Sequence, residues 1–169
     1  MLTILAALVV LVPLLMVQVG IFTNMPLLQG YPDLILLAVL AWALQPSVRR
    51  AWQWSVIGGI LMMLASATPP GVYLVAYALS VGFVSLLRRL VWRIPFLTMW
   101  VATIAGSFLT HGLSFFVLQL SGRELPIGFA FWTIILPSVF YNLLMALPIY
   151  ALVGEIARWT YPQEPLYEP

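Results

Sequence analysis

Charge is what this sequence has least of. Only 7% of its 169 residues are charged, whereas about 25% is usual in a soluble domain. Hydrophobic residues make up 63%, and the mean hydropathy is +1.07. So few charges cannot cover the surface of a soluble domain, and intrinsic disorder requires the opposite composition. The chain is therefore predicted to fold within a lipid bilayer.

Cysteine and lysine are absent, and histidine occurs once, as His111. The lack of cysteine excludes a disulfide framework, a thiol redox centre and a thiolate-bound metal, and one histidine excludes a histidine-rich metal site. A formal net charge of +2 is too small for the basic patch that nucleic-acid binding needs. We therefore expect no metal, no cofactor and no nucleic-acid partner.

Long apolar runs, in contrast, are abundant. A membrane-spanning helix takes about 20 residues, so six spans would use about 120 residues and leave about 50 for loops and ends. Six runs fit that arithmetic, and we predict spans at 2–22, 33–45, 51–67, 72–87, 96–120 and 127–153. They form one domain over 1–154, an all-α six-helix transmembrane bundle, followed by a short cytoplasmic tail over 155–169. The second run is the shortest, which leaves open whether it spans the membrane fully.

Arginine placement predicts the orientation of this bundle. If the spans alternate in direction, one side of the membrane holds Arg49, Arg50, Arg88, Arg89, Arg93 and Arg158. Only Arg123 lies on the other side. By the positive-inside rule the arginine-rich side is cytoplasmic, so both termini are expected in the cytoplasm.

Residues near the same boundary indicate contact with lipid. Arg88, Arg89 and Arg93 are placed to meet anionic headgroups. An interfacial aromatic belt is expected from four tryptophans: Trp52, Trp54, Trp92 and Trp159. Membrane lipid is therefore an expected partner.

The fifth span carries a polar stripe on one helix face. Spacings of four, four and three residues separate its members, which are Thr103, Ser107, His111 and Ser114. A ridge of small residues lies beside it: Ala102, Gly106 and Thr110. Close helix packing with interhelical hydrogen bonds is the favoured interpretation. A proton or substrate path is one alternative, and a serine protease pair of Ser107 with His111 is another.

The sixth span combines two prolines with an amide near its middle. Pro137 and Pro148 each remove a backbone donor and free a carbonyl one turn earlier. Asn142 lies between them, next to Tyr141 and four residues after Ser138, and its amide must find partners inside the bundle. An internal structural bond is favoured, and a bond to a helix of another protein is the alternative.

Pro32 and Asp33 open the second run. A carboxylate at this position caps a helix N-terminus and interacts favourably with the helix dipole. A fixed contact on the outer face of the membrane is the alternative role for Asp33.

Two sets of residues carry a family resemblance: the segment PDLILLAVLAWAL at 32–44, and LPS at 136–138 with Asn142 and ALPIY at 146–150. The first resembles the second span, and the other resembles the C-terminal span, of the MreD family, the rod shape-determining membrane proteins of bacteria. Length, six spans, cytoplasmic termini and arginine placement agree across nearly the whole chain. The family often carries an acidic residue at the end of the third span, where this chain reads LASATPPG at 64–71 and has no acid.

The resemblance implies a non-enzymatic scaffold subunit of the bacterial cell elongation machinery, located in the inner (plasma) membrane. Its expected partner is an MreC-like single-span protein with a large extracytoplasmic domain. Through that protein, the expected complex includes the glycosyltransferase RodA, its penicillin-binding transpeptidase and the actin-like MreB. The family is also similar in fold to the substrate-binding subunits of energy-coupling-factor transporters, so a vitamin transporter subunit is the alternative function.

The residue patterns and the resemblance together give a set of candidate sites. No catalytic residue is expected. The candidate partner-binding or structural residues are Pro32, Asp33, Gly106, His111, Pro137, Ser138, Tyr141, Asn142 and Pro148.

Overall fold

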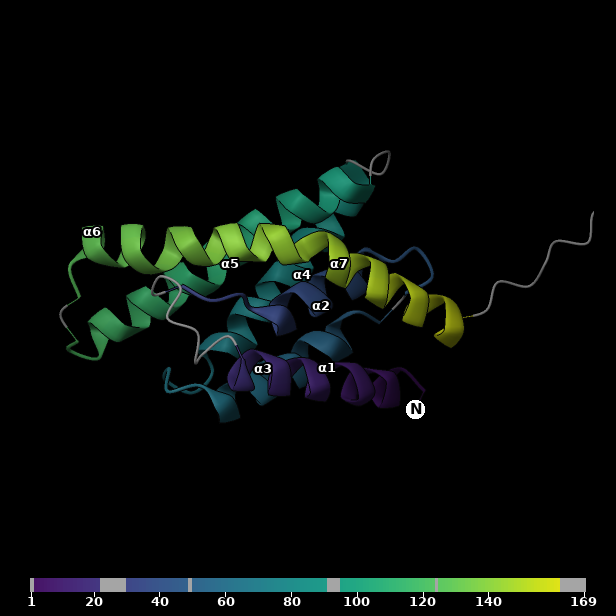
Figure 1. Ribbon diagram of the computed structural model, residues 1–169, viewed down its shortest axis with the longest axis horizontal. Helices are drawn as coiled ribbons and strands as arrows, with labels where there is room; N and C mark the ends of the chain where they lie inside the picture. Colours follow the sequence, from purple (N-terminus) through teal and green to yellow (C-terminus); the bar gives the residue numbers. More distant parts are fainter. Residues whose placement is uncertain (1, 22–29, 49, 91–94, 124, 162–169) are drawn as a thin grey trace, which may run out of the picture.

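The described part of the chain is helical throughout. The computed structural model describes residues 2–21, 30–48, 50–90, 95–123 and 125–161, and no strand occurs among them (Figure 1). In chain order the elements are α1 (Leu2–Gly20), α2 (Leu34–Leu44), α3 (Trp52–Ala65), α4 (Val72–Leu90), α5 (Pro95–Leu120), α6 (Ile127–Phe129), the π-helix η2 (Ala130–Ile135) and α7 (Leu136–Thr160). The predicted all-α class is confirmed.

Most helix bounds follow the predicted runs, and the main difference is at the end of α7. This helix continues to Thr160, so residues 155–160, which were predicted to belong to the tail, are helical. Gly154 does not end the helix, because it is buried against the side chain of Gln45 and no proline follows before Pro162. Residues 162–169 of the predicted tail lie outside the described part of the chain.

Pro137 has a larger effect on the sixth run than a simple kink. It lies in the first turn of α7, and the six residues before α7 form the π-helix η2. Proline has no N–H to donate, and its ring clashes with the carbonyl four residues earlier. The wider π turn separates that carbonyl from the ring, so the chain remains helical from Ile127 to Thr160. Pro148 lies inside α7 with its ring on the exposed side.

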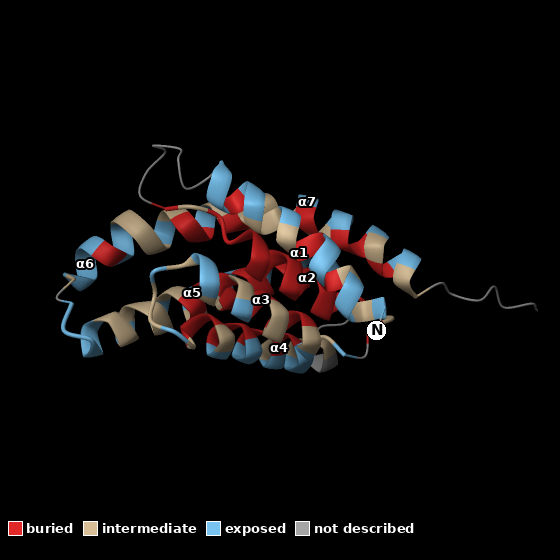
Figure 2. Cartoon of the chain, turned by 90° about the horizontal axis from the view of Figure 1, so that it is seen from below, coloured by how far each residue is buried: buried red, intermediate tan, exposed pale blue. Residues whose placement is uncertain are grey.

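Helix α2 forms the centre of the bundle. All eleven of its residues are buried, and it contacts α1, α3, α4, α5 and α7. Figure 2 shows the buried residues gathered along this central axis, with exposed residues on the outward faces of the surrounding helices. A helix that is apolar on every side belongs in such a fully enclosed position.

The two ends of the bundle are defined by contacts between distant residues. At one end, the Trp54 indole N–H donates to the Thr3 carbonyl at 3.2 Å, and the Thr3 and Tyr161 hydroxyls lie 3.0 Å apart. At the other end, Gln18 near the end of α1 contacts Met62 near the end of α3. Successive long elements therefore alternate in direction, and both ends of the described chain lie at one end of the bundle.

In the part of the chain that the structure describes, three helices are long and apolar enough to cross a membrane: Leu2–Gly20, Pro95–Leu120 and Ile127–Thr160. The other three apolar helices are shorter, and the eleven residues of α2 extend only about 16 Å. A bilayer has a hydrocarbon core about 30 Å thick. A membrane location is compatible with these lengths, and the crossing of all six segments stays a prediction.

The expected tryptophan belt needs one correction. Trp54 is fully buried and stacks on Trp42, with ring centroids 4.1 Å apart. It is a core residue, because the α3 face that carries it packs against α1 and α2. Trp52 and Trp159 are exposed, as expected for interfacial residues, and Trp92 lies outside the described part of the chain.

Candidate functional site

The N-terminus of α2 begins inside the bundle and is surrounded by polar side chains. The first backbone N–H groups of any helix have no partner within the helix itself, and in an apolar environment each must find another acceptor. We call the group that meets this need the capping cluster. It consists of Gln18 from α1, Asp33 before α2, Tyr77 from α4, Ser107 from α5, and Ser138 and Asn142 from α7.

Asp33 is the centre of the capping cluster. Its Oδ1 accepts a hydrogen bond from the Leu36 backbone N–H at 3.0 Å, which is the N-cap bond predicted from the sequence. The Tyr77 hydroxyl lies 2.7 Å from Oδ1 and 2.8 Å from Oδ2. The carboxyl group is thus buried, bonded on both oxygens and placed at the positive end of the α2 dipole.

The amide side chains of Asn142 and Gln18 complete the cap. Asn142 Oδ1 accepts from the Asp33 backbone N–H at 2.7 Å, and its Nδ2 donates to Ser107 Oγ at 2.8 Å. Gln18 Oε1 accepts from the backbone N–H groups of Leu34 at 2.8 Å and Ile35 at 3.4 Å. The start of α2 is therefore bonded to α1, α5 and α7 as well as to its own cap residue.

The segment before α2 packs closely on the junction between η2 and α7. A Cβ added to Gly30 would lie 2.7 Å from the Ser138 backbone nitrogen and 2.8 Å from Pro137 Cβ, so only glycine fits there. The Tyr31 backbone N–H donates to Ser138 Oγ at 3.3 Å. Burial raises the pKa of the Tyr31 hydroxyl, and its neighbours Tyr73 and Asp33 raise it further, so this group stays neutral.

Five of the candidate residues meet at or beside the capping cluster. Asp33, Ser138 and Asn142 belong to it, and Pro32 and Pro137 lie in the segments that carry them. The internal bond predicted for Asn142 is confirmed.

The other four candidates are not members of the cluster. Gly106 is buried and directly precedes Ser107 on α5, where an added Cβ would lie 3.1 Å from Leu40 Cδ1 of α2. This supports the helix-packing interpretation of the small-residue ridge. Tyr141 is half-buried, Pro148 is exposed and His111 lines a separate pocket.

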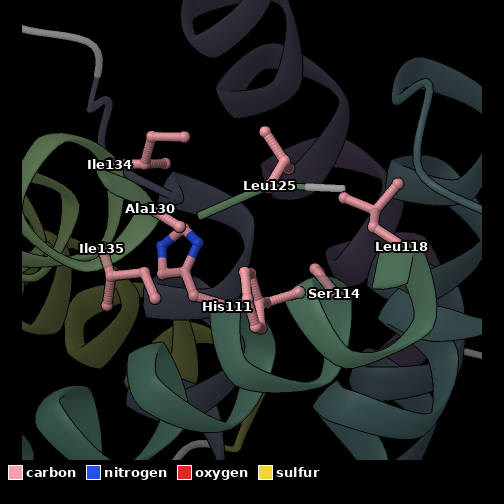
Figure 3. A pocket seen from close by; sticks show the side chains of 8 residues that line it. His111, Ser114, Leu118, Leu125, Ala130, Ile134 and Ile135 are labelled. Carbon is pink, nitrogen blue, oxygen red and sulfur yellow. The ribbon is translucent and has the colours of Figure 1, made fainter. Parts of the chain in front are cut away.

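The polar stripe of α5 divides into two environments. Ser107 is fully buried and bonded to Asn142. Thr103 is also fully buried, and its hydroxyl has no hydrogen-bond partner within the described residues. His111 and Ser114, in contrast, line a pocket of about 80 Å³ between α5 and η2 (Figure 3). Ser107 is thus bonded to an amide, and no hydrogen bond joins it to His111 in the part of the chain that the structure describes.

Sequence reasoning missed Gln18 and Tyr77, and it assigned Arg88 to lipid headgroups without predicting its contacts with the C-terminal end of α2. Gln18 and Tyr77 act at the N-terminus, as described above. At the C-terminus, Arg88 Nη1 donates to the carbonyls of Ala43 at 3.0 Å and Val48 at 3.5 Å. A cation there complements the negative end of the helix dipole. Gln18 was the most detectable signal, because it is a lone amide in a strongly apolar span.

The chemistry of the capping cluster is that of a structural network. Each of its polar side chains bonds to another member of the cluster, to the backbone of α2 or to the backbone of the segment just before α2. Among the described residues, no group of three histidine, cysteine or carboxylate side chains is placed to hold a metal ion. The cluster therefore fixes the relative positions of α1, α2, α4, α5 and α7.

The sequence matches no protein-family model and no curated protein, and the fold matches no solved structure. Function must therefore be argued from the capping cluster and from the surface around it.

Proposed function

We propose that the chain is an MreD-like scaffold subunit of the bacterial cell elongation machinery. In this proposal it is a six-span protein of the inner membrane with both termini in the cytoplasm. It binds an MreC-like single-span protein and, through it, supports the action of RodA, the transpeptidase and MreB in peptidoglycan synthesis. The observation that carries the proposal is the 2.7 Å bond from the Asp33 backbone N–H to Asn142 Oδ1.

That bond joins the two segments on which the resemblance to MreD rests. Each segment is short and mostly apolar, so each alone is a weak family signature. Asp33 and Asn142 are 109 residues apart in sequence, yet they meet at one buried point. Polar residues of both segments therefore cap the N-terminus of α2 inside the bundle. This contact supports the interpretation that the two segments together form a single family signature.

The distribution of arginines supports the proposed orientation. Arg88 bonds to carbonyls at the C-terminal end of α2, and Arg158 lies in the last turn of α7 at the same end of the bundle. Arg123 lies in the turn after α5, at the opposite end. The positive-inside rule assigns the first end to the cytoplasm.

A scaffold fits the interior better than a vitamin-binding subunit does. Ligand pockets for molecules of that size have volumes of about 300–1,000 Å³ and carry several polar groups that converge on the ligand. The pocket beside His111 has about 80 Å³, and a larger one of about 390 Å³ is lined by Leu2, Ile4, Leu5 and Leu8 of α1, which offer no polar side chain to a ligand. The polar groups of the capping cluster are already bonded to one another or to nearby backbone. In this proposal a protein partner is recognised by the outer faces of the helices and by the short turns between them.

Co-purification from membranes tests the proposed function. The tagged chain would be expressed with the MreC-like protein of the same bacterium, solubilised in dodecyl maltoside and captured, with an unrelated single-span protein as the matched control. We expect the MreC-like protein to be retained and the control to be lost, and depletion of the chain to turn rod-shaped cells round. Retention of neither protein, with rod shape intact after depletion, would contradict the proposal. A vitamin held through native mass spectrometry would favour the transporter subunit instead.

A further inference from the structure

The outer ends of α5 and of the α6–η2 segment project beyond the rest of the bundle. In Figures 1 and 2 these two ends extend past α1, α2 and α3. Many of their large apolar side chains are exposed, among them Phe116 (58%), Leu120 (72%), Ile127 (73%) and Trp132 (68%). Exposed apolar side chains also occur on the outward faces of the other helices, so this surface by itself fits either lipid or a second protein.

A pocket opens between the two arms of this projecting hairpin. Its volume is about 80 Å³, and its wall is apolar apart from His111 and Ser114. Figure 3 shows the imidazole of His111 directed across the pocket toward Ala130 of η2. The wider turn of a π-helix frequently marks a functional position, and here it forms the wall opposite the imidazole.

The imidazole is the polar group of the pocket that the fold leaves unused. Ser114 Oγ donates to the Thr110 carbonyl at 2.7 Å. His111 takes part in no hydrogen bond or ion pair within the described residues. Acyl chains of lipid cannot bond to an imidazole, so lipid tails filling this pocket would leave a polar group unsatisfied, which is unfavourable in an apolar environment. A polar side chain inserted from a protein helix would satisfy it.

The exposed face of α5 next to the pocket has room for such a helix. Phe108, Gly112 and Phe116 follow one another at spacings of four, so they form a stripe with a notch at its centre. A Cβ added to Gly112 would meet no atom within 4 Å, and the same holds for Gly128 on α6. Small residues at such positions allow the backbone of a second helix to approach closely.

We infer that this pocket is the docking site for the membrane-spanning helix of the single-span partner, an inference that rests on the proposed function. The partner helix packs over Gly112 and places one side chain bearing a hydroxyl or carboxamide group into the pocket, within hydrogen-bond distance of His111. A volume of about 80 Å³ accommodates one such side chain. The exposed aromatic residues around the pocket then cover the partner helix.

The absence of cysteine makes a direct test straightforward. Gly112→Cys and Gly128→Cys would each be labelled with benzophenone maleimide and irradiated in membranes that contain the MreC-like partner. Gly82→Cys is the matched control, because Gly82 is an exposed glycine of α4 whose added Cβ also meets nothing within 4 Å. We expect crosslinks to the partner from positions 112 and 128 and none from position 82. Crosslinks to a second copy of the chain, to lipid alone, or equally from position 82 would overturn the inference.

A second variant tests the role of the imidazole. His111→Leu keeps the size of the side chain and removes its polarity, and we expect capture of the partner to fall by about five- to tenfold. Gly82→Ala should leave capture unchanged. If the wild-type chain captures the partner and His111→Leu captures it equally well, the inference fails while the proposed function stands. If the wild-type chain captures no partner, both fail.

Discussion

Ser107 and His111 lie one turn apart on the same face of α5, yet their surroundings differ completely. Ser107 faces α7 where the two helices are in contact, and its hydroxyl accepts from Asn142. His111 faces η2 where the π-helix forms a pocket wall, and none of the residues that the structure describes forms a hydrogen bond with its imidazole. The hydrogen-bonded Ser107 helps to hold the bundle together, whereas His111, at the wall of a pocket, is available to another molecule. The helical periodicity that places both residues on one face does not distinguish these roles.

The largest loss of stability is expected when Asp33, the central residue of the capping cluster, is replaced. Asp33→Ala leaves the Tyr77 hydroxyl and the Leu36 N–H without their acceptor, and each buried orphan costs about 1–3 kcal/mol. We expect a loss of about 3 kcal/mol in the free energy of unfolding, measured by circular dichroism in mixed micelles. Asp33→Asn retains one acceptor oxygen and should lose about half as much. Equal stability of Asp33→Ala and wild type would show that the cluster is not structural.

A smaller effect is expected where two helices meet closely. An added Cβ at Gly59 would lie 2.7 Å from Leu74 Cα, so α3 and α4 must move apart in Gly59→Ala. We expect a loss of about 1–2 kcal/mol, because overpacking outweighs the gain in helix propensity. Gly82→Ala, in open space on α4, should gain about 0.5 kcal/mol. The same unfolding assay measures both, and a gain at position 59 would contradict the close approach of the two helices.

Arg88 tests whether side-chain bonds also stabilise the C-terminal end of α2. Arg88→Leu removes a donor from the Ala43 and Val48 carbonyls, and we expect a loss of about 1–2 kcal/mol. Arg158→Leu, which removes an exposed pair with Glu155, should change stability by less than about 0.5 kcal/mol. If both variants lose equally little free energy of unfolding, the bonds from Arg88 to the two carbonyls do not stabilise the protein.

The smallest effect on stability is expected at the pocket. His111→Leu removes no hydrogen bond within the described residues, so the free energy of unfolding should change by less than about 0.5 kcal/mol. The same variant is expected to weaken partner capture. A large loss of stability without any change in capture would assign His111 to the core.

The sequence predicted local features well and tertiary pairings poorly. Asp33 was expected to cap a helix and does so, because capping depends on residues only three positions apart. The partners Tyr77 and Gln18 were not predicted, because their bonds join residues far apart in the chain. No periodicity within one helix specifies which turn of a neighbouring helix lies opposite.

The burial of Trp54 and the π-helix η2 are two further features that local sequence patterns do not specify. Position near a span boundary predicted an interfacial role for Trp54, but its stacking on Trp42 depends on how α2 and α3 cross. Pro137 was expected to free a carbonyl, which is a local effect of proline. The sequence does not show that the chain accommodates Pro137 by forming a π-helix. The pocket beside His111 depends on that π-helix, because η2 forms one of its walls.

The Asn142 cap also sets the order in which the protein can be completed. Chains are synthesised from the N-terminus, so α2 leaves the ribosome long before residue 142 exists. Until α7 arrives, the Asp33 backbone N–H has no amide acceptor and Ser107 no amide donor. The bonds of Gln18 and Tyr77 can form earlier, but the cap at Asp33 stays incomplete until the final helix is added. We therefore expect nascent chains that stop short of α7 to be more open to quality-control proteases than the complete protein, however complete their other helices are.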